Sequence, residues 1–223
     1  MKKAFSLIEI FLIISLLGFL YTTFIPKMQI NKIDQISDKL VLYLKQTRYK
    51  ALIDDKHDDD NDYWHKKRWT LKFLKCRKDV GGIYYTIYSD KNASGHPGID
   101  DSLKDSLSLK NIYSSNYCKE NINNSSYVLI SKNYNIQDVV ISCNETTSLG
   151  QLSFGGDGKL YSKLSNIPND SNSYEVSDNC KIKLTDTFGE ERTIILESNT
   201  GYVYKNRENR ELPKFKLFLS GRS

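Results

Sequence analysis

The feature that most constrains this chain is a continuous apolar segment close to its N-terminus. Residues 5–25 read FSLIEIFLIISLLGFLYTTFI and contain a single charged residue, Glu9. A helix of this length rises about 31 Å, close to the hydrocarbon thickness of a bilayer. Lys2 and Lys3 precede the segment and predict a cytoplasmic N-terminus by the positive-inside rule. These observations predict a single-pass bacterial inner-membrane protein whose remaining residues lie on the periplasmic side.

Two simpler interpretations of the segment each explain only part of it. A secretory signal peptide has a shorter apolar core and ends in an A-x-A-like site, whereas this segment ends in TTFIPK. A plain membrane anchor explains the length but not Glu9, because a carboxylate at a helix centre in a bilayer costs about 2.5–3.5 kcal/mol. Glu9 lies near the inner end of the segment, where this cost is smaller, but a partner would still stabilise its carboxylate.

The residues KKAFSLIE resemble the N-terminus of type IV prepilins and type II secretion pseudopilins. The resemblance implies cleavage by a prepilin peptidase between Ala4 and Phe5, followed by methylation of the new terminus. It also implies that Glu9 and Pro26 serve assembly with other pilins or pseudopilins into a filament. The family usually has Gly before the cleavage site, and this chain has Ala4. A cationic amine at Phe5 would lie about one helical turn from Glu9 and could neutralise its carboxylate.

The resemblance predicts a pilin-like α+β fold. We expect a leader at 1–4, the transmembrane half of a spine helix at 5–26, its amphipathic half at 27–54, and a β-rich periplasmic head at 55–223. Apolar residues at helical spacing support the amphipathic half, because Ile33, Ile36, Leu40 and Leu44 fall on one face. Pro26 predicts a bend or local melting in an otherwise continuous helix.

Beyond residue 69 the apolar pattern changes to a period of two, which is typical of strands. Without βαβ spacing, the strands should pair antiparallel. The predicted strands are 69–76, 83–89, 127–132, 138–143, 151–154, 159–163, 180–186, 192–197, 201–205 and 214–219. The block LSFGGDGKLYS, with the strands after it, resembles the C-terminal sheet region of pseudopilin H and related minor pilins.

Four cysteines, Cys76, Cys118, Cys143 and Cys180, lack the C-x-x-C spacing of zinc or thioredoxin-like sites. An even number in an exported domain predicts two disulfides. Three pairings are possible. We favour Cys76–Cys118 and Cys143–Cys180, because each joins neighbouring parts of the sequence.

One segment has the oxygen spacing of a calcium loop. Asp90, Asn92 and Ser94 alternate, Gly95 lies at the turn position, and Asp101 lies near the end. Against a Ca²⁺ site, the segment follows a predicted strand, Pro97 interrupts it, and Asp101 replaces the usual Glu. These residue types are also common in turns, so a plain turn remains the alternative.

The sequence does not favour an enzyme, since it has no GxSxG or HExxH motif. The formal net charge of +5 is spread along the chain, which makes nucleic acid an unlikely partner. The leading hypothesis is a minor pilin or pseudopilin subunit of a type IV pilus or type II secretion pseudopilus. The alternative is a membrane-anchored binding module, either an adhesin or a DNA-uptake minor pilin.

Overall fold

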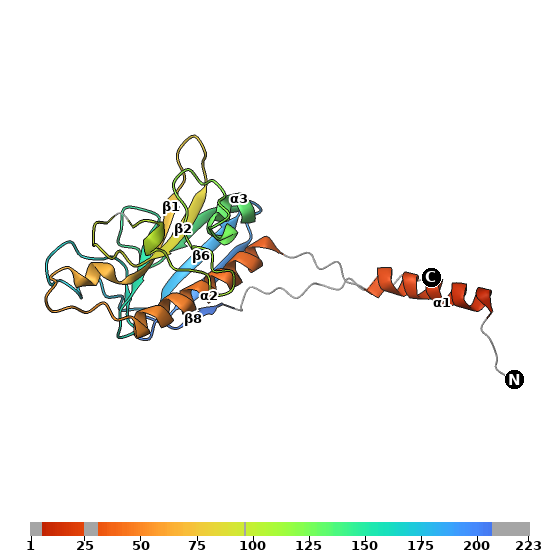
Figure 1. Cartoon of the computed structure of the whole chain (residues 1–223), viewed down its shortest axis with the longest axis horizontal. Coiled ribbons are helices and arrows are strands. Elements are labelled where there is room, and N and C mark those ends of the chain that lie inside the picture. Colours follow the sequence, from red (N-terminus) through yellow and green to blue (C-terminus); the bar gives the residue numbers. More distant parts are fainter. Residues whose placement is uncertain (1–5, 25–30, 96, 207–223) are drawn as a thin grey trace, which may run out of the picture. The chain divides into compact units, whose positions relative to one another are not determined.

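The computed structural model describes residues 6–24, 31–95 and 97–206. The chain divides into two compact units, Met1–Asn31 and Lys32–Ser223, which are described separately below. In the first unit, helix α1 spans Leu7–Phe24. The second unit begins with helix α2, Lys32–Ile53, and continues into two antiparallel sheets (Figure 1).

The expectation of a long spine helix, with an apolar transmembrane half at 5–26 and an amphipathic half at 27–54, is wrong, because Asn31 is not helical. Helix α1 has 18 residues and helix α2 begins at Lys32. Helix α2 carries charged residues along its length. Among the described residues, no helix combines the length and the apolar character needed to cross a membrane. The described residues therefore do not support the predicted single-pass localisation in the inner membrane.

The first sheet has the strand order β2-β1-β4-β5. Its strands are β1, Trp69–Lys75; β2, Ile83–Tyr88; β4, Gln151–Phe154; and β5, Leu160–Tyr161. The second sheet has the order β3-β6-β7-β8. Its strands are β3, Ile136–Ile141; β6, Cys180–Asp186; β7, Glu191–Leu196; and β8, Val203–Lys205. All neighbouring strands pair antiparallel, as the sequence predicts.

Helix α2 lies against both sheets and supplies much of the core (Figure 1). Its buried residues recur at helical spacing and are Ile33, Ile36, Ser37, Leu40, Tyr43, Leu44, Thr47 and Ala51. They pack with fully buried sheet residues such as Leu71, Phe73, Ile182 and Ile194. The alternation of β6, in which Cys180, Ile182 and Leu184 are buried, fits a sheet that uses one face for this core.

One predicted strand is a helix instead. Residues 127–132 contribute to a 3-10 turn, η3 (Ser126–Val128), and to a short helix, α3 (Ile130–Tyr134). Ser125 accepts a hydrogen bond from the Tyr127 amide at the start of the turn. Asn135 adopts a left-handed conformation, with φ of 60°, and ends α3. The apolar run Tyr-Val-Leu-Ile has no periodicity that distinguishes a strand from a helix, so tertiary packing decides which of the two forms. The remaining predicted strand, 214–219, lies outside the described residues.

The prediction of two disulfides is confirmed. Cys76, directly after β1, bonds to Cys118 in the long loop before η3, with a Cα–Cα distance of 5.8 Å. Cys143, shortly after β3, bonds to Cys180 at the start of β6, with a Cα–Cα distance of 5.4 Å. Both pairings join neighbouring cysteines along the sequence, and the second fixes the end of the β3–β6 strand pair.

Candidate functional site

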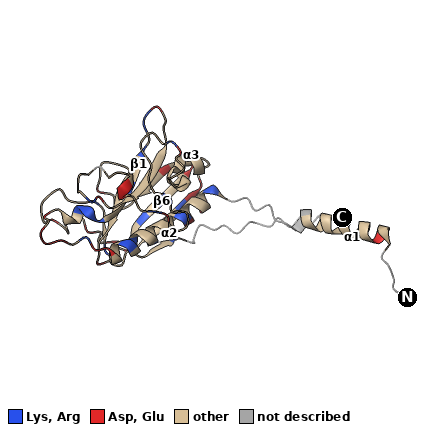
Figure 2. Cartoon of the chain, viewed as in Figure 1, with Lys and Arg blue, Asp and Glu red and all other residues tan. Residues whose placement is uncertain are grey.

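Helix α1 is apolar on all sides and exposed within its unit. Glu9 is its only charged residue, visible as the red segment near one end of the helix in Figure 2. The exposed fraction of its large apolar side chains runs from 38% at Leu20 to 88% at Leu7. Contiguous apolar surface of this extent marks a contact site in a folded protein. Helix α1 is therefore the first candidate functional surface of the chain.

Glu9 participates in a capping box at the start of α1. The Ser6 amide donates to Glu9 Oε2 at 2.8 Å, and the Glu9 amide donates to Ser6 Oγ at 3.3 Å. This reciprocal pairing satisfies two backbone donors that the first helical turn leaves without partners. The Ser-x-x-Glu spacing is a capping signal in the sequence, and the interpretation of Glu9 as an assembly residue does not include this role.

The other predicted N-terminal site residues, Ala4, Phe5 and Pro26, lie outside the described residues. Cleavage before Phe5, methylation there and pairing of the new amine with Glu9 therefore stay predictions. The capping box shows only that Glu9 already has a local structural role in the chain.

A buried ionic cluster joins α2 to the loop after η2 (Ile99–Asp101). Asp105 accepts hydrogen bonds from the Tyr43 hydroxyl at 2.5 Å and pairs with Lys39 Nζ at 2.8 Å. Ser125 Oγ lies 2.9 Å from the Tyr43 hydroxyl and extends the cluster to η3. Burial by itself would raise the pKa of Asp105, but hydrogen bonds from Lys39 and Tyr43 outweigh it and hold that pKa well below its usual value. Burial and the neighbouring Asp105 raise the pKa of Tyr43.

A second ionic cluster joins the first turn of α2 to the edge of the second sheet. Asp34 accepts two hydrogen bonds from Arg192 of β7, at 2.8 and 3.0 Å, and pairs with Lys205 of β8 at 2.6 Å. The bond from Arg192 is the main reason that the pKa of Asp34 lies far below its usual value. Both clusters hold α2 in place against the rest of the second unit.

The predicted calcium-loop residues form turn hydrogen bonds. Asp90 Oδ2 accepts from the Gly95 amide at 2.6 Å, and Asn92 Oδ1 accepts from the Ser94 amide at 3.1 Å. Asp101 Oδ2 accepts from the Gly98 amide at 3.0 Å. Within residues 6–24, 31–95 and 97–206, no three His, Cys, Asp or Glu side chains lie close enough to hold a metal ion. These contacts are those of a plain turn, and the calcium site stays a prediction.

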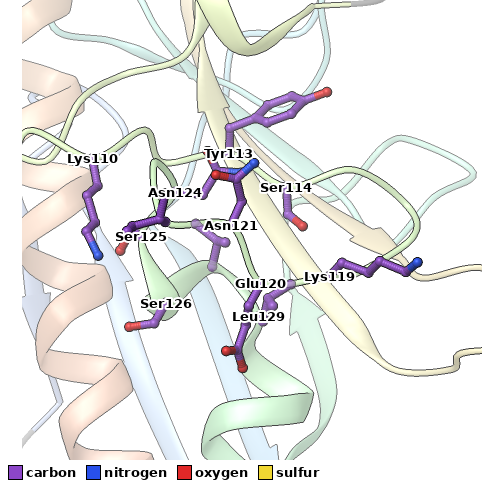
Figure 3. A pocket seen from close by; sticks show the side chains of 12 residues that line it. Lys110, Tyr113, Ser114, Lys119, Glu120, Asn121, Asn124, Ser125, Ser126 and Leu129 are labelled. Carbon is purple, nitrogen blue, oxygen red and sulfur yellow. The ribbon is translucent and has the colours of Figure 1, made fainter.

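A polar pocket of about 240 Å³ lies beside the Cys118 loop (Figure 3). In Figure 3, the side chains of Lys119 and Tyr113 point away from Asn124 and Ser125. Glu120 supplies a carboxylate to the lining, and Lys132 Nζ lies 3.2 Å from it. The described residues that line it are Lys110, Tyr113, Ser114, Lys119, Glu120, Asn121, Ile122, Asn124, Ser125, Ser126, Val128 and Leu129. This mixture of serine, asparagine and lysine suits polar contacts.

No family model, curated protein or solved structure matches this chain. The resemblance of the N-terminal residues to prepilins is therefore neither strengthened nor weakened by comparison, and a function has to be argued from the chain itself.

Proposed function

We propose that this chain is a minor pilin or pseudopilin subunit that assembles through helix α1 into a type IV pilus or a type II secretion pseudopilus. In this proposal a prepilin peptidase removes residues 1–4, and α1 then packs against the corresponding helices of neighbouring pilins. The observation that carries the proposal is the exposed, apolar surface of α1 behind a prepilin-like sequence.

The size of the apolar surface supports assembly energetically. Fully burying one Leu, Ile or Phe side chain contributes about 1.5–3 kcal/mol. Twelve large apolar side chains of α1, from Leu7 to Tyr21, have more than a third of their surface exposed. If neighbouring helices cover half of this surface, the gain is on the order of 10 kcal/mol, which is comparable with the 4–15 kcal/mol cost of association. Several simultaneous neighbours, as in a filament, would make the contact stable.

The second unit also fits a filament subunit. Its β-rich core is reinforced by two disulfides, and its ionic clusters fix α2 against the sheets. On the side of α2 opposite the core, Leu42, Tyr49 and Ile53 recur at helical spacing and are exposed. This second apolar row provides a further surface for contact with neighbouring subunits.

Intact-mass measurement of the chain from its native host tests the processing step. We expect a species that begins at Phe5 and carries one added methyl group. A species that retains Met1, or one cleaved within the body of α1, would contradict the proposal.

Crosslinking in cells that express the partner pilins tests the assembly step. Ile13→Asp places a second carboxylate in the middle of α1 and should remove the crosslinked oligomers. The matched control is Leu109→Asp, which makes the same kind of change at an exposed apolar residue of the second unit. If Ile13→Asp forms the same oligomers as the wild type, α1 is not the assembly surface.

A further inference from the structure

A second polar cavity, of about 370 Å³, lies on the first sheet and is separate from the pocket of Figure 3. Its floor comes from three adjacent strands, with Lys72 of β1, Tyr88 of β2 and Gln151 of β4. Leu71 and Phe73 are fully buried on the core side of β1. Because side chains alternate along a strand, Lys72 lies on the opposite face, where the register sets it beside Gln151.

Loops that are far apart in the sequence form the walls of this cavity. They come from the segment after β2, from the loop before β4 and from the segment after β5. Lys66, in the 3-10 turn η1 (Trp64–Lys67), completes the rim. The wall residues are Ala93, Ser94, Gly95, Thr146, Thr147, Ser148, Lys163, Leu164 and Asn166.

The lining has an excess of positive charge. Among the described residues of the lining, Lys66, Lys72 and Lys163 are accompanied by a single carboxylate, that of Asp90. Lys66 Nζ lies over the Tyr63 ring at 4.8 Å, and Lys163 Nζ lies over the Tyr174 ring at 4.9 Å. None of the three lysines forms an ion pair with a described residue. An anionic ligand group would therefore meet ammonium groups that have no carboxylate partner.

Asp90 contributes an acceptor to the same cavity. Its side chain is 3% exposed, and Oδ2 accepts a hydrogen bond from the Gly95 amide. Oδ1 is buried and has no hydrogen-bond partner in the described part of the chain. Buried acceptors without a donor are rare in folded proteins, so this oxygen is suited to a donor supplied by a ligand.

The combination of groups selects a ligand class. Serine, threonine, asparagine and glutamine side chains offer hydrogen bonds to a polyol, while the lysines offer charge to a carboxylate. Tyr88 is 6% exposed, so it presents little ring surface on which a nucleic-acid base could stack. We propose that this cavity binds a carboxylated sugar of the uronate or sialate class.

Surface plasmon resonance on the immobilised full-length chain tests the proposal. The probes are glucuronate, its uncharged counterpart glucose, and inorganic phosphate. We expect glucuronate to bind more tightly than either of the others. Lys72→Gln should weaken glucuronate binding about tenfold, the effect of losing one hydrogen bond to a charged group.

Lys75→Gln is the matched control, because it removes the same charge from the same strand at an exposed residue that does not line the cavity. Circular dichroism of both variants checks that the fold is retained. Equal binding of glucose and glucuronate, equal binding of phosphate, or equal effects of the two lysine substitutions would each overturn the assignment. The substitutions leave α1 intact, so the crosslinking test of assembly gives an independent result.

Discussion

Replacing Asp105 by asparagine should destabilise the second unit strongly. The Asp105 carboxylate accepts hydrogen bonds from the Tyr43 hydroxyl, from Lys39 Nζ, and from the amides of Leu107 and Ser108. Asparagine keeps the shape but loses the charge, and its amide group directs hydrogens at neighbouring donors. Asp105 is 3% exposed, so water cannot replace the lost interactions.

The magnitude follows from the burial of the pair. Side-chain exposure is 14% for Lys39 and 4% for Asp105, so this ion pair belongs to the buried class. Removing one member of such a pair costs about 3–5 kcal/mol, a large fraction of the 5–15 kcal/mol stability of an ordinary domain. Urea denaturation of residues 31–223, followed by circular dichroism at pH 7, measures the free energy of unfolding directly.

The stability difference should also depend on pH. The folded pKa of Asp105 lies well below its unfolded value of about 3.9. Such a group stabilises the fold fully above its unfolded pKa, and the contribution is lost as the pH falls through the folded pKa. The difference in the free energy of unfolding between wild type and Asp105→Asn should therefore be largest at pH 6–7 and should decrease below about pH 4.

Asp100→Asn is the matched control, because Asp100 is an exposed aspartate in the same part of the chain. Its free energy of unfolding should stay within about 0.5 kcal/mol of the wild type. The reasoning fails if Asp105→Asn is no less stable than this control at pH 7, or if its stability gap does not change between pH 7 and pH 3.

The disulfides, two glycines and the loop that contains Asp90 give further testable outcomes. Thiol titration of the denatured, unreduced protein should detect no free cysteine, and Cys143→Ala with Cys180→Ala should lower the free energy of unfolding by about 3–4 kcal/mol. Gly201→Ala should be more destabilising than Gly189→Ala. Both glycines have positive φ, but only at Gly201 would an added Cβ lie 2.6 Å from a backbone oxygen, that of Gly158. Equal losses of unfolding free energy in urea denaturation would contradict this. Millimolar calcium should leave the melting temperature unchanged, because hydrogen bonds already close the loop containing Asp90; a rise that Asp90→Ala abolishes would restore the calcium interpretation.

Local patterns predicted many of the secondary-structure elements. Strands β1 and β6 begin at the predicted residues because each alternates between the core and the outer face of its sheet. The buried face of α2 was predictable because its apolar residues recur at the helical period, at Ile33, Ile36, Leu40 and Leu44. Residues 127–132 have no apolar periodicity, and the strand predicted there is wrong. An apolar run without alternation is compatible with either a helix or a strand.

The candidate sites depended far more on tertiary structure. The capping box of Ser6 and Glu9 spans three residues and was readable in the sequence. The contact of Asp34 with Arg192 joins residues 158 positions apart, and nothing in either local segment selects that partner. The register of β7 beside β8, with α2 packed across them, brings these charges together.

The sequence by itself determined the apolar character of α1, the amphipathic face of α2, the alternating pattern of the strands and the cysteines available for two disulfides, because each depends on residue type or on residues close along the chain. Only the tertiary structure decided that Lys39 and Tyr43 meet Asp105, and that Lys66, Lys72 and Lys163 line one cavity with Asp90. Such contacts depend on strand register and on loops that converge from distant segments. Those are set by the packing of the whole core, in which each side chain has to fit all of its neighbours at once.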